Sequence, residues 1–170
     1  MRIYGIRGMD RTEKTADPLG EFEGYTIPHG EANTLSTKLS KYGYQPTVYF
    51  IYQPAEFARQ TLEAMRPTYQ LPSAEVVYAP DIEEGADIIG ALIHTPTMRW
   101  WCGNTFGIED TKKLGLKWSG PTTIQVAISI LSALRYMIKH PKLGFITPEA
   151  LPLTVLKDCI NILGCVSRKL

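Results

Sequence analysis

The segment "PTTIQVAISILSALRYMIKHP", residues 121–141, decides the fold class that this sequence predicts. Its apolar residues recur at spacings of three and four, which places them on one face of an α-helix. That face comprises Ile124, Ala127, Ile128, Leu131, Leu134 and Ile138. A second apolar stripe comprises Val126, Ile130, Ala133 and Met137. We therefore expect a helix that packs on two sides, either deep in a domain or in an oligomer interface.

Shorter segments around this helix predict a mixture of strands and helices. Strands are expected at residues 2–7, 25–28, 46–52, 74–80, 87–95 and 98–103. Helices are expected at residues 31–43, 55–65, 107–115 and 152–163, and a polar loop at residues 10–24. The strand at 87–95 is the most apolar and should be central in its sheet, with 98–103 beside it. This order predicts a mixed α/β or α+β fold, with a mixed sheet and packed helices in a single domain, residues 1–170.

Composition narrows the classes of partner. The chain has 170 residues, of which 44% are hydrophobic and 21% charged, and its formal net charge is +1. This balance suits a domain with a real core and predicts neither a nucleic-acid nor a membrane-surface partner. The segment 122–138 is too short and too polar for a transmembrane helix, and no signal peptide opens the chain. Three cysteines without a CxxC pair predict neither a disulfide framework nor a structural zinc site, so we expect a cytoplasmic protein.

Common cofactor motifs are missing from the sequence. "GIRG", residues 5–8, is the only glycine pair near a predicted strand, and no third glycine opens a helix after it. A Rossmann fingerprint is therefore absent, and so are a Walker A loop and an HExxH motif. We do not expect this chain alone to hold a dinucleotide in the usual way.

Two adjacent tryptophans, Trp100 and Trp101, precede Glu109 and Asp110 by a short interval. An aromatic face beside a carboxylate suits an organic cation. The same residues are also compatible with a strand whose alternation puts at least one ring in the core, followed by a solvated helix. The pattern by itself favours the core.

Other candidates have an equally simple structural interpretation. His29 and Glu31 lie at a predicted strand-to-helix turn, a common position for active-site groups, but Glu31 also complements a helix dipole and His29 suits a turn. Asp81 belongs to an acidic cluster that predicts a solvated loop, or alternatively a diamine or metal site. Cys102 is interpreted as a small buried residue because no histidine or carboxylate can be placed beside it.

Four segments together resemble the homospermidine synthase family, within the saccharopine dehydrogenase-like superfamily. They are "EGYTIPHGEANTLS" (23–36), "YQPTVYFIYQP" (44–54), "WWCGNTFGIEDTKKL" (100–114) and "TTIQVAISILSALRYMIKHPKLGFITPEAL" (122–151). They occur in the family's order between about residue 10 and Gly164, and the ordered set is more specific than any one motif.

The resemblance implies NAD-dependent conversion of putrescine to homospermidine. Members pair a Rossmann domain with a mixed α/β domain that binds substrate and dimerises, and this chain is similar to the second of these. One amine is oxidised by hydride transfer to NAD, a second putrescine captures the imine with loss of ammonia, and the NADH reduces the adduct. In such an enzyme the protein orients the diamines while the nicotinamide transfers hydride.

The resemblance also implies roles for individual residues. The family's gating, cation-binding tryptophan corresponds to Trp101, and its diamine-binding carboxylates correspond to Glu109 and Asp81. His29 and Glu31 match the turn that faces the nicotinamide, which makes them candidate cofactor-binding residues. Together with Trp101 and Glu109 they are also the candidate catalytic residues. If the strand alternates, Trp101 should face the diamine pocket and Trp100 should face the packing.

The family's nucleotide-binding half does not correspond to any part of these 170 residues. Neither does its segment beyond the last helix, which contributes a histidine. The chain could be a fragment, half of a split enzyme whose Rossmann domain is on a partner chain, or a stand-alone domain without catalysis. We expect a substrate-binding and dimerisation domain, inactive without a nucleotide-binding half. The alternatives are a non-catalytic scaffold domain and a polyamine-binding module.

Overall fold

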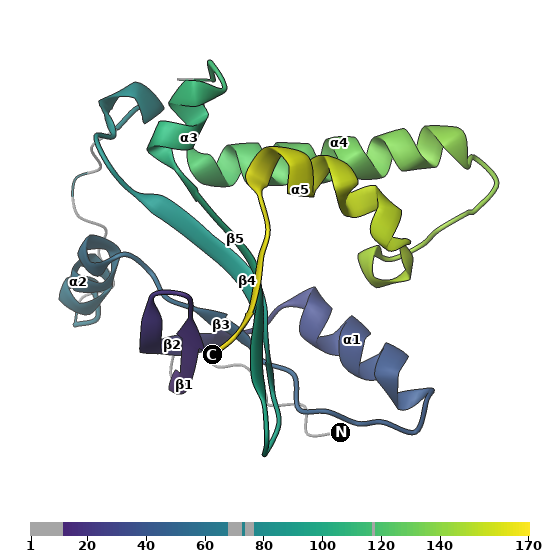
Figure 1. The fold of residues 1–170 in the computed structure, drawn as a ribbon. Helices are drawn as coiled ribbons and strands as arrows, with labels where there is room; N and C mark the ends of the chain where they lie inside the picture. The colour runs from purple at the N-terminus through teal and green to yellow at the C-terminus, as the bar shows by residue number, and fades with distance from the viewer. Residues whose placement is uncertain (1–11, 68–72, 74–76, 117) are drawn as a thin grey trace. The chain divides into compact units, whose positions relative to one another are not determined.

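The computed structural model describes residues 12–67, 73, 77–116 and 118–170. The chain forms two compact units, Met1–Glu75 and Val76–Leu170, and each is described by itself. The fold is mixed α/β, with helices and two antiparallel three-stranded sheets (Figure 1). We expected one mixed sheet, but the described part of the chain contains two antiparallel sheets. The expectation of a single domain stays a prediction.

The first unit contains a β-hairpin where the sequence predicted a loop. Its elements are β1 (Thr12–Asp17), β2 (Gly20–Ile27), α1 (Gly30–Ser40), β3 (Phe50–Tyr52) and α2 (Glu56–Met65). The loop prediction for residues 10–24 was wrong because one face of an antiparallel hairpin can be polar. Asp17 closes the turn: its carboxylate accepts hydrogen bonds from the backbone N–H groups of Leu19 (2.7 Å) and Gly20 (3.2 Å). Gly20 has φ +148°, which favours glycine.

The other elements of this unit follow the sequence more closely. Both predicted helices are confirmed as α1 and α2, and β2 ends directly before Pro28 as expected. The strand predicted at 46–52 is only the three-residue β3, which pairs with the end of β2. The strand predicted at 2–7 lies outside the described residues.

As far as its residues are described, the second unit is a three-stranded antiparallel sheet with three α-helices. Its strands are β4 (Ala86–His94), β5 (Arg99–Gly107) and β6 (Val166–Lys169), and its helices are α3 (Ile108–Lys113), α4 (Pro121–Lys139) and α5 (Lys157–Leu163). Short 3₁₀ turns occupy Ala79–Asp81, Pro148–Ala150 and Leu153–Leu156. The strand order is β4-β5-β6, so β5 is central rather than β4 as predicted. Of the strand predicted at 74–80, residues 74–76 lie outside the described part, and the rest is not a strand.

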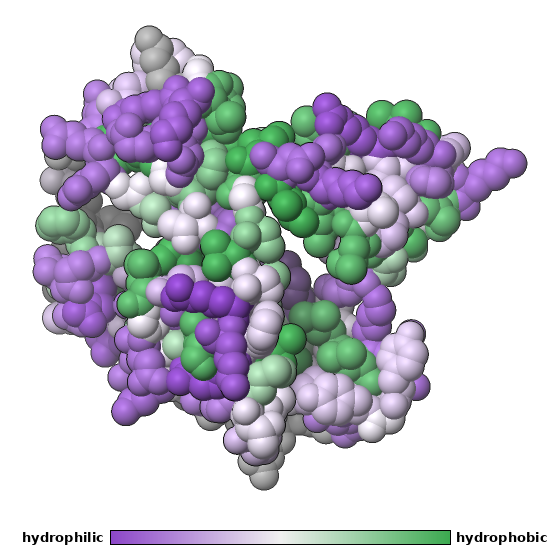
Figure 2. Space-filling model, in the orientation of Figure 1, coloured by the Kyte–Doolittle hydropathy of each residue, from purple (hydrophilic) through white to green (hydrophobic). Residues whose placement is uncertain are grey.

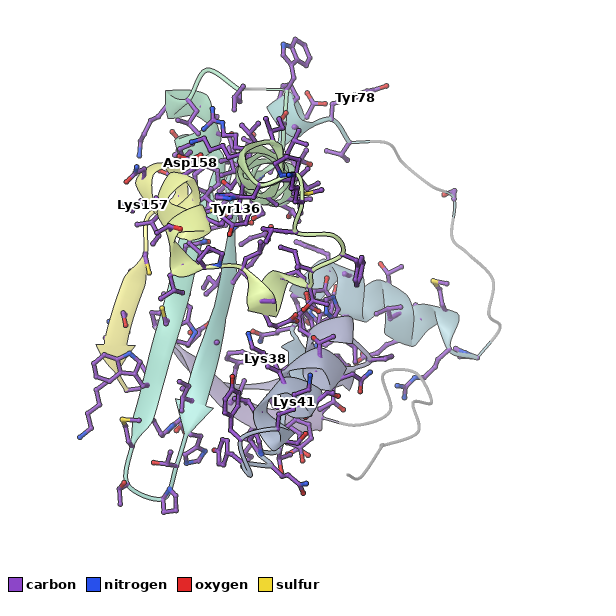
Figure 3. All side chains as sticks on the ribbon, turned by 90° about the vertical axis from the view of Figure 1, so that its right-hand side faces the viewer. Lys38, Lys41, Tyr78, Tyr136, Lys157 and Asp158 are labelled. Atoms are coloured by element: carbon purple, nitrogen blue, oxygen red, sulfur yellow. The ribbon has the colours of Figure 1, made fainter. Side chains whose placement is uncertain are left out.

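The core of this unit lies between β5 and the helices α4 and α5. Its buried side chains are Phe106, Ile124, Ile128 and Leu163. A partly buried polar pair lies beside them, in which Gln125 Nε2 donates to Asn104 Oδ1 at 2.8 Å. Arg135 on α4 forms a 2.7 Å ion pair with Asp158, and Figure 3 shows Asp158 near Tyr136, the residue that follows Arg135. In the residues that the structure describes, no helix is long and apolar enough to cross a membrane.

Candidate functional site

Trp101 lies flat on the sheet, over a pair of glycines. Gly90 and Gly103 are direct partners across β4 and β5. A Cβ atom on Gly90 would come within 2.4 Å of Trp101 Cζ2, and one on Gly103 within 2.7 Å of Cη2. Alternation along β5 puts this ring on the face opposite Phe106. The glycines thus leave the space that the indole occupies, and Trp101 is 3% exposed.

The exposed fractions of the two rings differ in the sense opposite to the expected one, while a role of Trp101 toward a diamine stays a prediction. We expected Trp101 to face a pocket and Trp100 to face the packing. Instead Trp100 is 37% exposed, and its indole N–H donates to Ser167 Oγ at 2.8 Å on β6. The prediction that alternation buries one ring is confirmed, and the buried ring is Trp101, which lies over Gly90 and Gly103.

Glu109 lies in the first turn of α3, where its carboxylate accepts a 2.7 Å hydrogen bond from Lys112. Its side chain is 70% exposed. Trp101 is six residues before the end of β5, a length of about 20 Å at about 3.3 Å per residue. The structure therefore does not bring the Glu109 carboxylate beside the Trp101 ring.

Asp81 and Asp110 both act locally at helix starts. Asp81 accepts a 3.3 Å hydrogen bond from the backbone N–H of Tyr78 at a 3₁₀ turn. Asp110 accepts a 3.0 Å hydrogen bond from the backbone N–H of Gly107 and another from Lys113. The Gly107 hydrogen bond, followed by the Lys113 one, holds the pKa of Asp110 below its usual value. These carboxylates stabilise turns, and the diamine-binding role of Asp81 stays a prediction.

His29 and Glu31 meet in the first unit, as their spacing suggests. His29 precedes α1 in an extended conformation, and its Nδ1 contacts a carboxylate oxygen of Glu31. The imidazole also stacks on Phe50, with ring centroids 3.9 Å apart and an interplanar angle of 14°. The strand-to-helix turn therefore builds a His–Glu pair on an aromatic ring. Trp101, Glu109 and Asp81 belong to the other unit.

A polar hollow in the first unit was not expected from the sequence. It has a volume of about 460 Å³, and its lining includes Glu23, Tyr25, Glu56 and Arg59. Arg59 forms a 2.8 Å ion pair with Glu56. The side-chain hydrogen bond that Arg59 donates to Glu56 in this pair lowers the pKa of Glu56. The two charges compensate each other. The ion pair could have been predicted from the sequence, because Glu56 and Arg59 are three residues apart in a predicted helix and such residues are neighbours on the helix surface.

The cysteines also differ from expectation. Cys102 is exposed rather than buried, and its Sγ lies 3.8 Å from Sγ of Cys165. Within the described residues, no group of three or more His, Cys, Asp or Glu side chains could hold a metal ion.

Comparison with known proteins gives no match to this chain among family models, curated proteins or solved structures. The similarity to homospermidine synthase therefore rests on the four quoted segments alone.

Proposed function

We propose that this chain is the substrate-binding and dimerisation domain of a homospermidine synthase-like enzyme, and that α4 joins two copies of it. The observation that supports dimerisation is the open apolar face of α4. The rest of the proposal follows from the resemblance. We propose that the enzyme is cytoplasmic and that its NAD-binding half lies on another polypeptide or in another part of the same enzyme.

One face of α4 is apolar and, among the residues that the structure describes, stays exposed. Its exposed side chains are Val126 (52%), Ile130 (62%), Leu131 (44%), Leu134 (49%), Met137 (56%) and Ile138 (70%). Figure 2 shows hydrophobic residues at the surface around this helix. Six such side chains expose an area on the order of several hundred Å², the size at which an apolar patch marks an interaction site. The opposite face of the same helix packs on the core described above.

A second copy of the chain is the occupant that this face fits best. The exposed face has no charged residue, since Arg135 and Lys139 lie toward the other side of the helix. Two such faces can pair around a two-fold axis without bringing like charges together. The two predicted stripes are thereby corrected. Ile124 and Ile128 of the first stripe pack on the core. The rest of that stripe's large side chains, Leu131, Leu134 and Ile138, join the second stripe on the open face, which packs on the partner in this proposal.

We expect the purified chain to form a dimer that Leu134→Asp weakens by about 100-fold or more. The new carboxylate would lose its water in the centre of the interface without a partner charge. Analytical ultracentrifugation over a concentration series measures the dimer dissociation constant. Leu153→Asp is the matched control, because Leu153 is 82% exposed but lies outside α4.

Circular dichroism should show that both variants keep the wild-type helix content. A wild-type chain that stays monomeric at high concentration would contradict the proposal. So would equal weakening by both substitutions.

The diamine-binding part of the proposal has its own test. We expect putrescine to bind and Glu109→Gln to weaken its binding about fivefold, because a charge pair at an exposed site contributes up to about 1 kcal/mol. Calorimetry measures the affinity, with Glu63→Gln on α2 as a control. Glu109 is preferable to Trp101 for this test because its side chain is largely exposed and its removal leaves the core intact.

Mass spectrometry of the chain mixed with NAD and putrescine should detect no homospermidine. Turnover without a second protein would refute the need for a partner half. A stable dimer that does not bind putrescine would favour the non-catalytic scaffold function instead.

A further inference from the structure

Two of the three cysteines lie side by side on neighbouring strands. Cys102 is on the central strand β5, and Cys165 directly precedes β6. Both are exposed, and their sulfur atoms are 3.8 Å apart although the residues are 63 positions apart in sequence. The third cysteine, Cys159, is half-buried on α5 and lies 3.5 Å from Ser132 Oγ.

The strand register explains why these two thiols meet. Cys102 pairs with Ser167 across the β5–β6 ladder. Cys165 is two residues before Ser167, so it is the diagonal neighbour of Cys102 on the same face of the sheet. Diagonal neighbours lie about 7–8 Å apart, at the upper edge of the separation that a disulfide spans, so a small movement of the loosely held β6 accompanies the bond. The 3.8 Å between the two sulfur atoms shows that the side chains already point toward each other.

We propose that Cys102 and Cys165 form a reversible disulfide that fastens β6 to the centre of the sheet. The oxidant is a low-molecular-weight disulfide such as oxidised glutathione. In a reducing compartment the two thiols stay free, and the bond forms when the ratio of oxidised to reduced glutathione rises.

The chemistry is thiol–disulfide exchange in two steps. One cysteine thiolate attacks a glutathione sulfur, which forms a mixed disulfide and releases one glutathione thiolate. The second cysteine loses its proton and attacks the protein-bound sulfur of the mixed disulfide, which releases the second glutathione. The protein loses two electrons and two protons, and one oxidised glutathione becomes two reduced molecules. Because partial desolvation and the contact with Cys102 raise the pKa of the Cys165 thiol, exchange should accelerate with rising pH.

The strand that the disulfide would hold is weakly attached without it. All four residues of β6 are exposed, and within the described part of the chain the strand pairs with Trp100–Gly103 of β5 alone. The Trp100–Ser167 hydrogen bond and a 3.0 Å hydrogen bond from Leu170 N to Arg99 O add two further links. Gly164, with φ +74°, joins the strand to α5. Strands with so little buried area open locally at low free-energy cost, so a covalent link at the start of β6 should have a large local effect.

The test uses the whole chain, incubated in glutathione buffers of increasing oxidised fraction at a pH of about 8. We expect a mass loss of about 2 Da and, after proteolysis, a Cys102–Cys165 peptide pair. Hydrogen exchange of the amides in residues 166–170 should slow by about tenfold or more, and dithiothreitol should restore the original rate. Cys159→Ser should behave as wild type, whereas Cys102→Ser should retain a glutathione adduct and show no slowing.

Three results would overturn the proposal. The first is a peptide map that shows Cys159 in the disulfide, or an intermolecular link. The second is a stable glutathione adduct as the end product in the wild-type chain. The third is a Cys102–Cys165 disulfide that leaves the exchange of β6 unchanged. The wild-type protein decides each of them, so a variant that fails to fold does not obscure the outcome.

Discussion

Replacing Trp101 with alanine is expected to lower the free energy of unfolding by about 3–5 kcal/mol, the usual cost of removing a buried large aromatic side chain. The ring is 3% exposed and covers Gly90 and Gly103, neither of which has a side chain that could fill the space left behind. Urea titration measures the change in the free energy of unfolding. Circular dichroism is the better probe of unfolding here, because the substitution itself removes part of the tryptophan fluorescence.

Trp118→Ala is the matched control for this measurement. Trp118 is 73% exposed, so its truncation should cost less than about 1 kcal/mol. If Trp101→Ala is as stable as the control, the indole is not packed on the glycine pair. The orientation expected from the homospermidine synthase resemblance, with Trp101 facing a diamine pocket, would then be favoured.

Replacing Gly103 with alanine should destabilise the second unit by about 3 kcal/mol or more, at the upper end of overpacking costs. A Cβ atom at this position would lie 2.2 Å from the carbonyl oxygen of Ile89 and 2.4 Å from Cα of Gly90. Both are backbone atoms, so the β4–β5 ladder itself must move, and the Trp101 indole must leave its place. Hydrogen exchange of the β4 and β5 amides, together with urea titration, measures the loss.

Gly120→Ser tests whether the effect is specific to this contact. Gly120 precedes α4 and has an ordinary negative φ, and a Cβ atom added to it would meet no neighbouring atom within 4 Å. Serine is at least as good as glycine at a helix N-cap, so stability should stay within about 0.5 kcal/mol of wild type. Wild-type stability of Gly103→Ala would mean that the two strands do not approach each other as described.

Much of the helical structure could be predicted because its signals are local. Pro121 and Pro141 bracket α4, and the repeat of three and four residues identifies its apolar positions. Gly115 and Gly164 follow α3 and α5 with positive φ, as expected of residues that end helices. The meeting of His29 with Glu31 could also be anticipated, since two residues at one turn have few other arrangements.

Strand pairing was harder to predict because it depends on residues far apart in sequence. The polar hairpin of β1 and β2 has little apolar alternation, so its residues suggested a loop. The short, exposed β6 has no hydrophobic signal of its own, and it is a strand only because β5 offers it a partner. Without β6, neither the central position of β5 nor the Cys102–Cys165 contact can be deduced.

The sequence by itself determined the mixed α/β class, the limits of α2 and α4, and the burial of one ring of the tryptophan pair. Period and capping are properties of neighbouring residues, so they can be read without knowledge of the fold. Only the tertiary structure decided that the buried ring is Trp101, that Glu109 lies far from it along β5, and that one apolar face of α4 stays open. Those outcomes depend on the register that sets Gly90 opposite Gly103, and on which helix face meets the sheet. Both follow from packing between distant segments, where a shift of one residue would turn each side chain to the other face.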